Sequence, residues 1–128
     1  MAAARAEIGK HPYLWGAKVF TPTGPLDCSG FTRAVILAAG GPDIGLGTWF
    51  QRVYCKAQAR QLLTMRHEYE AGDLLFWMNE GPETPSHVGI ASGEGTVIEE
   101  TATYGNVVES PVSPRWAQSF VEAWRIFS

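Results

Sequence analysis

The sequence predicts an α+β domain whose helices pack against one side of a five- to six-stranded antiparallel sheet. The first observation is a helical apolar pattern, in which Phe31, Ala34, Val35 and Ala38 recur at the spacing of one helix face. The second is a change of character at Gly72, after which short apolar segments alternate with turn residues. Because the helical segments come first and the strands follow, we expect the helices on one side of a single sheet.

Length and composition limit what the chain can be. Its 128 residues suit a single domain, 1–128, with one core. A net charge of -3 provides no basic stripe for nucleic acid or an anionic membrane, so we expect neither as a partner. No apolar run approaches the length needed to cross a bilayer. Residues 1–8 lack a long apolar segment and an export cleavage pattern, so no signal peptide is expected in this chain.

Three helices are expected in the first half. Residues 2–8 favour a short helix, and the central helix begins beside Cys28 and is ended by the glycines that follow Ala39. Residues 49–63 carry apolar side chains at irregular helical spacing, which predicts a shorter helix that covers the central one. Within this last helix, Cys55 is expected to be a half-buried packing residue.

Strands are expected in the second half, at residues 73–78, 87–91, 96–101, 106–109 and 120–127. In the second of these, alternation places His87, Gly89 and Ala91 on one face and Val88 and Ile90 on the other. The small residues on the histidine face are expected to leave room for a helix to lie close.

Cys28 is the candidate nucleophile, because it stands at the mouth of the central helix. Asp27 or Ser29 would cap the helix, and the unpaired N–H groups of its first turn favour a thiolate. The alternative is a small buried hydrophobic residue, the usual role of a free cysteine. A disulfide with Cys55 would consume the best nucleophile, so we do not expect one.

His87 is the candidate partner of that thiol. It begins an apolar strand with small neighbours, whereas His11 and His67 have the local sequence of surface residues. A cysteine at a helix start and a histidine on a facing strand form the arrangement that thiol catalysis requires. His87 would form an imidazolium beside the Cys28 thiolate and later protonate the leaving amine.

The next strand offers Glu99 and Glu100 to orient the imidazole, one on each face. A three-residue loop, Ser92 to Glu94, would place Glu99 opposite His87, whereas a two- or four-residue loop would place Glu100 there. A zinc site built from Cys28, His87 and one glutamate would lack a closely spaced ligand pair, so no metal is expected.

Five segments together resemble the NlpC-type cell-wall peptidases, which are papain-like cysteine peptidases related to the CHAP amidases. They are HPYLWGA at 11–17, LDCSGF at 26–31, AGDLLFW at 71–77, SHVGIASGEGTVIE at 86–99 and SFVEAWRI at 119–126. The resemblance implies a papain-like fold with the catalytic cysteine at the N-terminus of the central helix. It implies Cys28 as nucleophile, His87 as base and Glu99 as the third polar residue, at a position where the family more commonly has histidine.

The same resemblance implies that Tyr13, Asp27, Ser29 and Ser86 lie near the substrate, although Tyr13 is also compatible with a core role and Asp27 with a helix cap. It further implies hydrolysis of an amide bond in peptidoglycan stem peptides, most often between D-glutamate and a diamino acid. No cofactor is implied. Such an enzyme would act on the cell wall, in an extracellular or periplasmic location, or would be phage-associated.

Two other functions fit the same sequence. One is a phage tail-tip or assembly component that keeps the hydrolase fold mainly for interaction. The other is an amidase or acyltransferase of the same fold that acts on another substrate, since specificity lies in loops. We expect a monomer unless the chain is part of a phage tail assembly.

Overall fold

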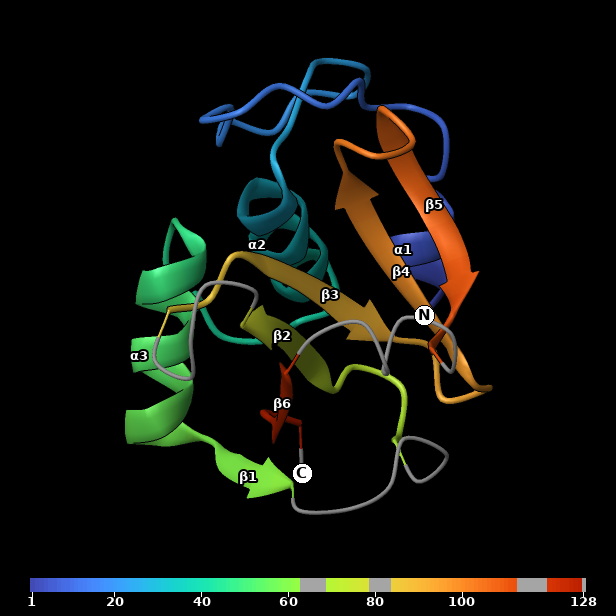
Figure 1. Ribbon diagram of the computed structural model, residues 1–128. Helices are drawn as coiled ribbons and strands as arrows, with labels where there is room; N and C mark the ends of the chain where they lie inside the picture. Colours follow the sequence, from blue (N-terminus) through green and yellow to red (C-terminus); the bar gives the residue numbers. More distant parts are fainter. Residues whose placement is uncertain (63–68, 79–83, 113–119, 128) are drawn as a thin grey trace.

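The computed structural model describes residues 1–62, 69–78, 84–112 and 120–127. Its helices and strands are α1 (Ala2–Arg5), α2 (Cys28–Ala38), α3 (Thr48–Gln58), β1 (Arg60–Leu62), β2 (Leu74–Met78), β3 (His87–Ala91), β4 (Thr96–Thr101), β5 (Asn106–Pro111) and β6 (Phe120–Arg125). The strands form one antiparallel sheet of six strands in the order β1-β6-β2-β3-β4-β5 (Figure 1). The predicted α+β class is therefore confirmed.

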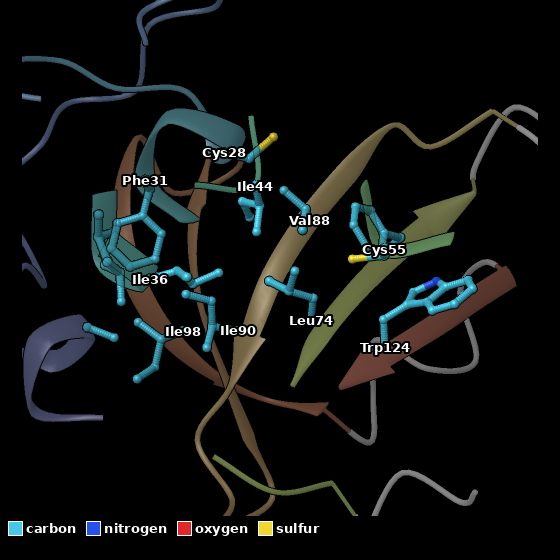
Figure 2. Close-up of a cluster of buried hydrophobic side chains, with 14 of the residues drawn as sticks. Cys28, Phe31, Ile36, Ile44, Cys55, Leu74, Val88, Ile90, Ile98 and Trp124 are labelled. Atoms are coloured by element: carbon cyan, nitrogen blue, oxygen red, sulfur yellow. The ribbon is translucent and has the colours of Figure 1, made fainter. Parts of the chain in front are cut away.

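One buried cluster lies between the helices and a face of the sheet. Phe31 of α2 and Ile98 of β4 belong to this cluster, as do Cys55 of α3 and Trp124 of β6 (Figure 2). Buried residues of all three helices belong to this cluster, so the helices pack against one side of the sheet as predicted. Removing each large side chain of this kind from water stabilises the fold by roughly 1.5–3 kcal/mol.

The opposite face of the sheet carries a second buried cluster. Leu75 and Trp77 of β2, Ala91 of β3 and Val97 of β4 belong to it. All five residues of β2 are buried, because its alternate side chains enter the two clusters in turn. Among the residues listed above as described, no helix has the length and apolar character needed to cross a membrane.

The prediction that α2 packs against the face of β3 that carries His87 is wrong. Val88 and Ile90 belong to the same cluster as the residues of α2, whereas Ala91 belongs to the second cluster. Helix α2 therefore lies against the bulky side chains of β3, where more apolar surface can be buried.

The predicted helix over 49–63 is too long. Helix α3 ends at Gln58, Ala59 has extended backbone angles (φ -118°, ψ 169°), and β1 then pairs with β6. Pairing with β6 at the edge of the sheet gives the backbone N–H and C=O groups of β1 hydrogen-bond partners. The spacing of apolar side chains in the sequence does not reveal such a pairing. Leu63, the last residue of the predicted helix, lies outside the described part of the chain.

Two buried side chains differ from the sequence-based expectation. His11, predicted to lie on the surface, is fully buried and makes hydrogen bonds with Glu7 Oε1 at 2.7 Å and the Gly24 carbonyl at 2.8 Å. Cys55 is fully rather than half buried. Both cysteines are free thiols. His67, also predicted to lie on the surface, is outside the described residues.

A buried ion pair fastens α3 to β6. Arg52 Nε and Nη2 donate to the two carboxylate oxygens of Glu122 at 2.7 and 2.9 Å, and Trp124 Nε1 also donates to Glu122 at 2.7 Å. Each side chain of the pair is only 8% exposed. Removing one partner would leave the other charge buried without its counter-charge. The free-energy cost of that unpaired charge exceeds the stabilisation that the intact pair provides.

We predict that Glu122→Ala lowers the free energy of unfolding by about 3–5 kcal/mol, because Arg52 then keeps a buried charge. Urea denaturation followed by circular dichroism measures the change. The control is Asp43→Ala, which removes an exposed ion pair with Arg33 and should hardly alter stability. Equal effects of the two substitutions would contradict the role of the buried pair.

Candidate active site

Cys28 is the first residue of α2, and Asp27 fixes that position. Asp27 is extended (φ -95°, ψ -179°), and its Oδ1 accepts hydrogen bonds from the Gly30 N–H at 2.7 Å and from Ser29 Oγ at 2.9 Å. Asp27 is therefore the helix cap, one of the two alternatives that the sequence offered. Cys28 is 7% exposed and lies in the first turn, where N–H groups point beyond the helix end.

The start of α3 is held against this turn. Gly47, whose φ of 96° suits glycine, donates its N–H to Ser29 Oγ at 3.2 Å. Thr48 Oγ1 then lies 3.5 Å from Cys28 Sγ. Gln51 Nε2 donates to the Ser29 carbonyl at 2.8 Å, so Ser29 is a buried structural link between the two helices.

A second segment crosses the helix start. The Asp27 N–H donates to the Ala17 carbonyl at 2.7 Å, and the Lys18 ammonium pairs with the Asp27 carboxylate. A Cβ on Gly30 would lie 2.8 Å from the Ala17 carbonyl oxygen, so only glycine permits this approach. The glycine of the DCSG sequence is thus required by packing.

His87 lies at the start of β3 and is held by Glu99. Its Nε2 lies 2.6 Å from Glu99 Oε1, and its ring packs at 5.3 Å from the Trp77 ring. The His87 side chain is 14% exposed, whereas that of Glu99 is fully buried. With Nε2 engaged by the carboxylate, the second ring nitrogen remains for Cys28.

The electrostatics couple the thiol to the imidazole. Burial alone disfavours a charged Cys28, but hydrogen bonding and attraction to His87 outweigh it, so the pKa of the thiol is lowered. Burial likewise opposes a charged His87, but Cys28 and Glu99 raise its pKa to about 9. The imidazole therefore favours the thiolate form of Cys28, and the thiolate in turn favours the imidazolium form of His87.

The hairpin between β3 and β4 turns one residue later than predicted. Ala91 pairs with Val97 and the Ser92 N–H donates to the Thr96 carbonyl at 3.0 Å, so the three-residue turn is Gly93 to Gly95 rather than Ser92 to Glu94. The number of connecting residues is still odd, so Glu99 remains on the expected face of the sheet. Its position along the strand is shifted by two residues.

This shift in register explains why residue 89 is a glycine. Glu99 now lies across from Gly89 and reaches His87 diagonally. A Cβ on Gly89 would be 2.6 Å from Val97 Cγ2 and 3.4 Å from Glu99 Cβ. The glycine therefore makes room for side chains of β4, and not for a helix as its sequence context suggested.

The other two residues expected near the substrate have different surroundings. Tyr13 pairs with Leu26 just before the cap, and burial, followed by the charges of Cys28 and Asp27, raises the pKa of its hydroxyl. Ser86 is exposed and donates to the Trp77 carbonyl at 3.1 Å. The structure thus gathers Tyr13 and Asp27 around Cys28, and sets Ser86 beside His87.

Sequence reasoning missed Thr48 and Lys18. Nothing in the local sequence marks either, although the glycine before Thr48 is a recognisable helix-start signal. Within the described ranges, no three His, Cys, Asp or Glu side chains are grouped as metal ligands.

The comparisons with known proteins agree on one family. The NlpC/P60 family model matches residues 9–125. The curated Peptidoglycan DL-endopeptidase CwlO of Bacillus licheniformis is 30% identical over 116 residues, covering 88% of this chain and 24% of its own length. Probable endopeptidase YafL of Escherichia coli is 29% identical and matches 95% of this chain and 47% of itself. The chain thus spans less than half the length of these curated relatives.

Solved structures give the same result. The NlpC/p60 domain of the peptidoglycan hydrolase SagA superposes with a TM-score of 0.71 at 36% identity, covering 94% of this chain and 92% of that domain. The peptidoglycan hydrolase RipB of Mycobacterium tuberculosis gives a TM-score of 0.72 at 26% identity, covering 99% and 62%. A capped cysteine helix that faces a histidine strand, within a match that spans residues 9–125, shows that this chain belongs to the NlpC/P60 family.

Proposed function

We propose that this chain is a cysteine peptidase that hydrolyses an amide bond in the stem peptides of peptidoglycan. Cys28 is the nucleophile, His87 the base and Glu99 the group that orients His87. The observation that carries the proposal is the position of His87, which lies 2.6 Å from Glu99 and lowers the pKa of Cys28. Two relatives whose names include peptidoglycan endopeptidase or hydrolase support the choice of substrate.

The reaction begins with the ion pair. The Cys28 thiolate attacks the carbonyl carbon, and the new C–S bond leaves negative charge on the carbonyl oxygen, which backbone N–H groups at the start of α2 stabilise. The His87 imidazolium then protonates the leaving amine as the C–N bond breaks. Water, deprotonated by His87, attacks the thioester and releases the acid and the thiol.

The bond most consistent with the family is that between D-glutamate and a diamino acid. The name of the Bacillus licheniformis relative, a DL-endopeptidase, supports this choice. Tyr13 would contact the peptide beside Cys28, and Ser86 would do so beside His87. Asp27 and Ser29 would act indirectly, because both are buried and hydrogen-bonded to each other. The enzyme would act at the cell wall.

A single experiment tests this function directly. Purified muropeptides incubated with the chain should be cleaved, and mass spectrometry should locate the new ends at the D-glutamyl bond. Cys28→Ala and His87→Ala should each lower kcat/KM by roughly 10³-fold or more, and the losses should not add, because the two groups act as one unit. Near-normal turnover in His87→Ala would refute the assignment of the base.

Selective alkylation tests the thiolate without any substrate. We expect iodoacetamide at mildly acidic pH to modify Cys28 much faster than Cys55, because burial raises the pKa of Cys55 to about 12 while His87 lowers that of Cys28. Peptide mapping by mass spectrometry measures both rates. Faster labelling of Cys55 would remove the physical basis of the nucleophile.

Glu99→Gln tests the third residue. The amide keeps a hydrogen-bond acceptor but loses the charge that raises the pKa of His87, so turnover should fall roughly 10²-fold. The alkaline limb of the kcat/KM profile should move to lower pH, because His87 then loses its proton more easily. Glu109→Gln, on β5 and paired with Arg5, is the matched control and should leave the profile unchanged. If the alkaline limb of Glu99→Gln stays at the same pH, the proposed role of the contact between Glu99 and His87 is contradicted.

A further inference from the structure

Glu100 is a buried carboxyl group that the reaction above does not use. It pairs with Val107 of β5 in the sheet and is fully buried. Among the residues that the structure describes, neither of its oxygens has a hydrogen-bond partner. Buried polar groups in proteins are nearly always hydrogen-bonded, so a carboxyl group in this state calls for a reason.

Glu100 lies on the side of the sheet opposite Glu99, which is the side that packs against α2, the helix that Cys28 begins. Alternation along β4 places Glu100 on the face of Ile98, which packs against α2. The turn after β4 is tied to the chain before α2, because the Tyr13 N–H donates to the Gly105 carbonyl at 2.9 Å and Tyr13 pairs with Leu26. Glu100 is thus enclosed between its own sheet and the approach to Cys28.

The groups that face Glu100 are acidic or neutral. Cys28 on α2, Asp27 at its cap and Tyr13 on the preceding segment are the titratable ones, and Lys18 is paired with Asp27. On the same face, Val88 and Ile90 of β3 and Val107 of β5 are apolar. Glu109 of β5 also lies on this face, where its carboxylate is paired with Arg5 of α1. Burial, with smaller contributions from Cys28 and Asp27, raises the pKa of Glu100 to about 8, so the carboxyl is protonated at neutral pH.

We propose that Glu100 is a positioning residue that limits the reactivity of Cys28 on the alkaline side. In its protonated form it leaves the thiolate and the helix start undisturbed. When it ionises, it places a second negative charge beside the sulfur and the site of the oxyanion. That charge disfavours both the thiolate and the oxyanion. The coupling is reciprocal, because the thiolate disfavours the ionised carboxylate by the same free energy.

The kinetic test rests on the proposed function. Glu100→Gln keeps the shape of the side chain but cannot ionise, so the alkaline limb of kcat/KM should move upward by about one pH unit, from about 8 to the value near 9 set by His87. The acid limb should stay in place, because Glu100 is protonated there in either protein. An alkaline limb that does not move would overturn the proposal.

The matched control is Glu94→Gln. This substitution removes the same charge, but from an exposed side chain that pairs with Arg5. Both limbs of the kcat/KM profile should therefore stay in place. An equal shift in this control would mean that net charge, and not Glu100, sets the limb, and would also overturn the proposal.

A second measurement needs no substrate. The carboxyl carbon of Glu100, observed by NMR with ¹³C-labelled glutamate, should titrate near pH 8 in the unmodified chain and at lower pH in Cys28→Ser, which lacks the thiolate. Titration near the ordinary glutamate value in both proteins would overturn the proposal, even if Glu100→Gln failed to fold. A chain that cleaves no muropeptide but shows this shift would lose the proposed function and keep the coupling.

Discussion

The cap at Asp27 is the interaction on which the rest of the site depends. By accepting the Gly30 N–H, its carboxylate fixes the residue at which α2 begins, and thereby places Cys28 in the first turn. The same carboxylate holds Ser29 and Lys18, which bring two other segments against the helix start. A change at this one side chain would alter the helix boundary, the approach of both segments and the orientation of the thiol together.

The sheet supplies the second requirement, which is a histidine held at a fixed distance from its carboxylate. Pairing of β3 with β4 brings Glu99 within 2.6 Å of His87, and Gly89 leaves the space through which it reaches the ring. Two glutamates that are neighbours in sequence thus have opposite surroundings. Glu99 meets an imidazolium and stabilises it, whereas Glu100 meets acidic groups in a buried position and is held protonated at neutral pH.

Several features follow from the sequence alone, because they depend on interactions between residues close along the chain. The apolar spacing after Cys28 predicted the central helix, which extends from Cys28 to Ala38. Alternation predicted the strands that became β3 and β4, and the two-residue period restricted the partner of His87 to a choice between two glutamates. The choice of Glu99 came from the family motif, and the hairpin register predicted with it was wrong.

The tertiary structure decided what local patterns do not encode. The packing of α2 against Val88 rather than Gly89 depends on which face buries more apolar area in the assembled domain. The burial of His11 depends on partners that only the folded chain brings to its ring. Thr48 lies 3.5 Å from Cys28 Sγ although the two are far apart in sequence. Such contacts join segments across a core, and sequence spacing carries no information about distances of that kind.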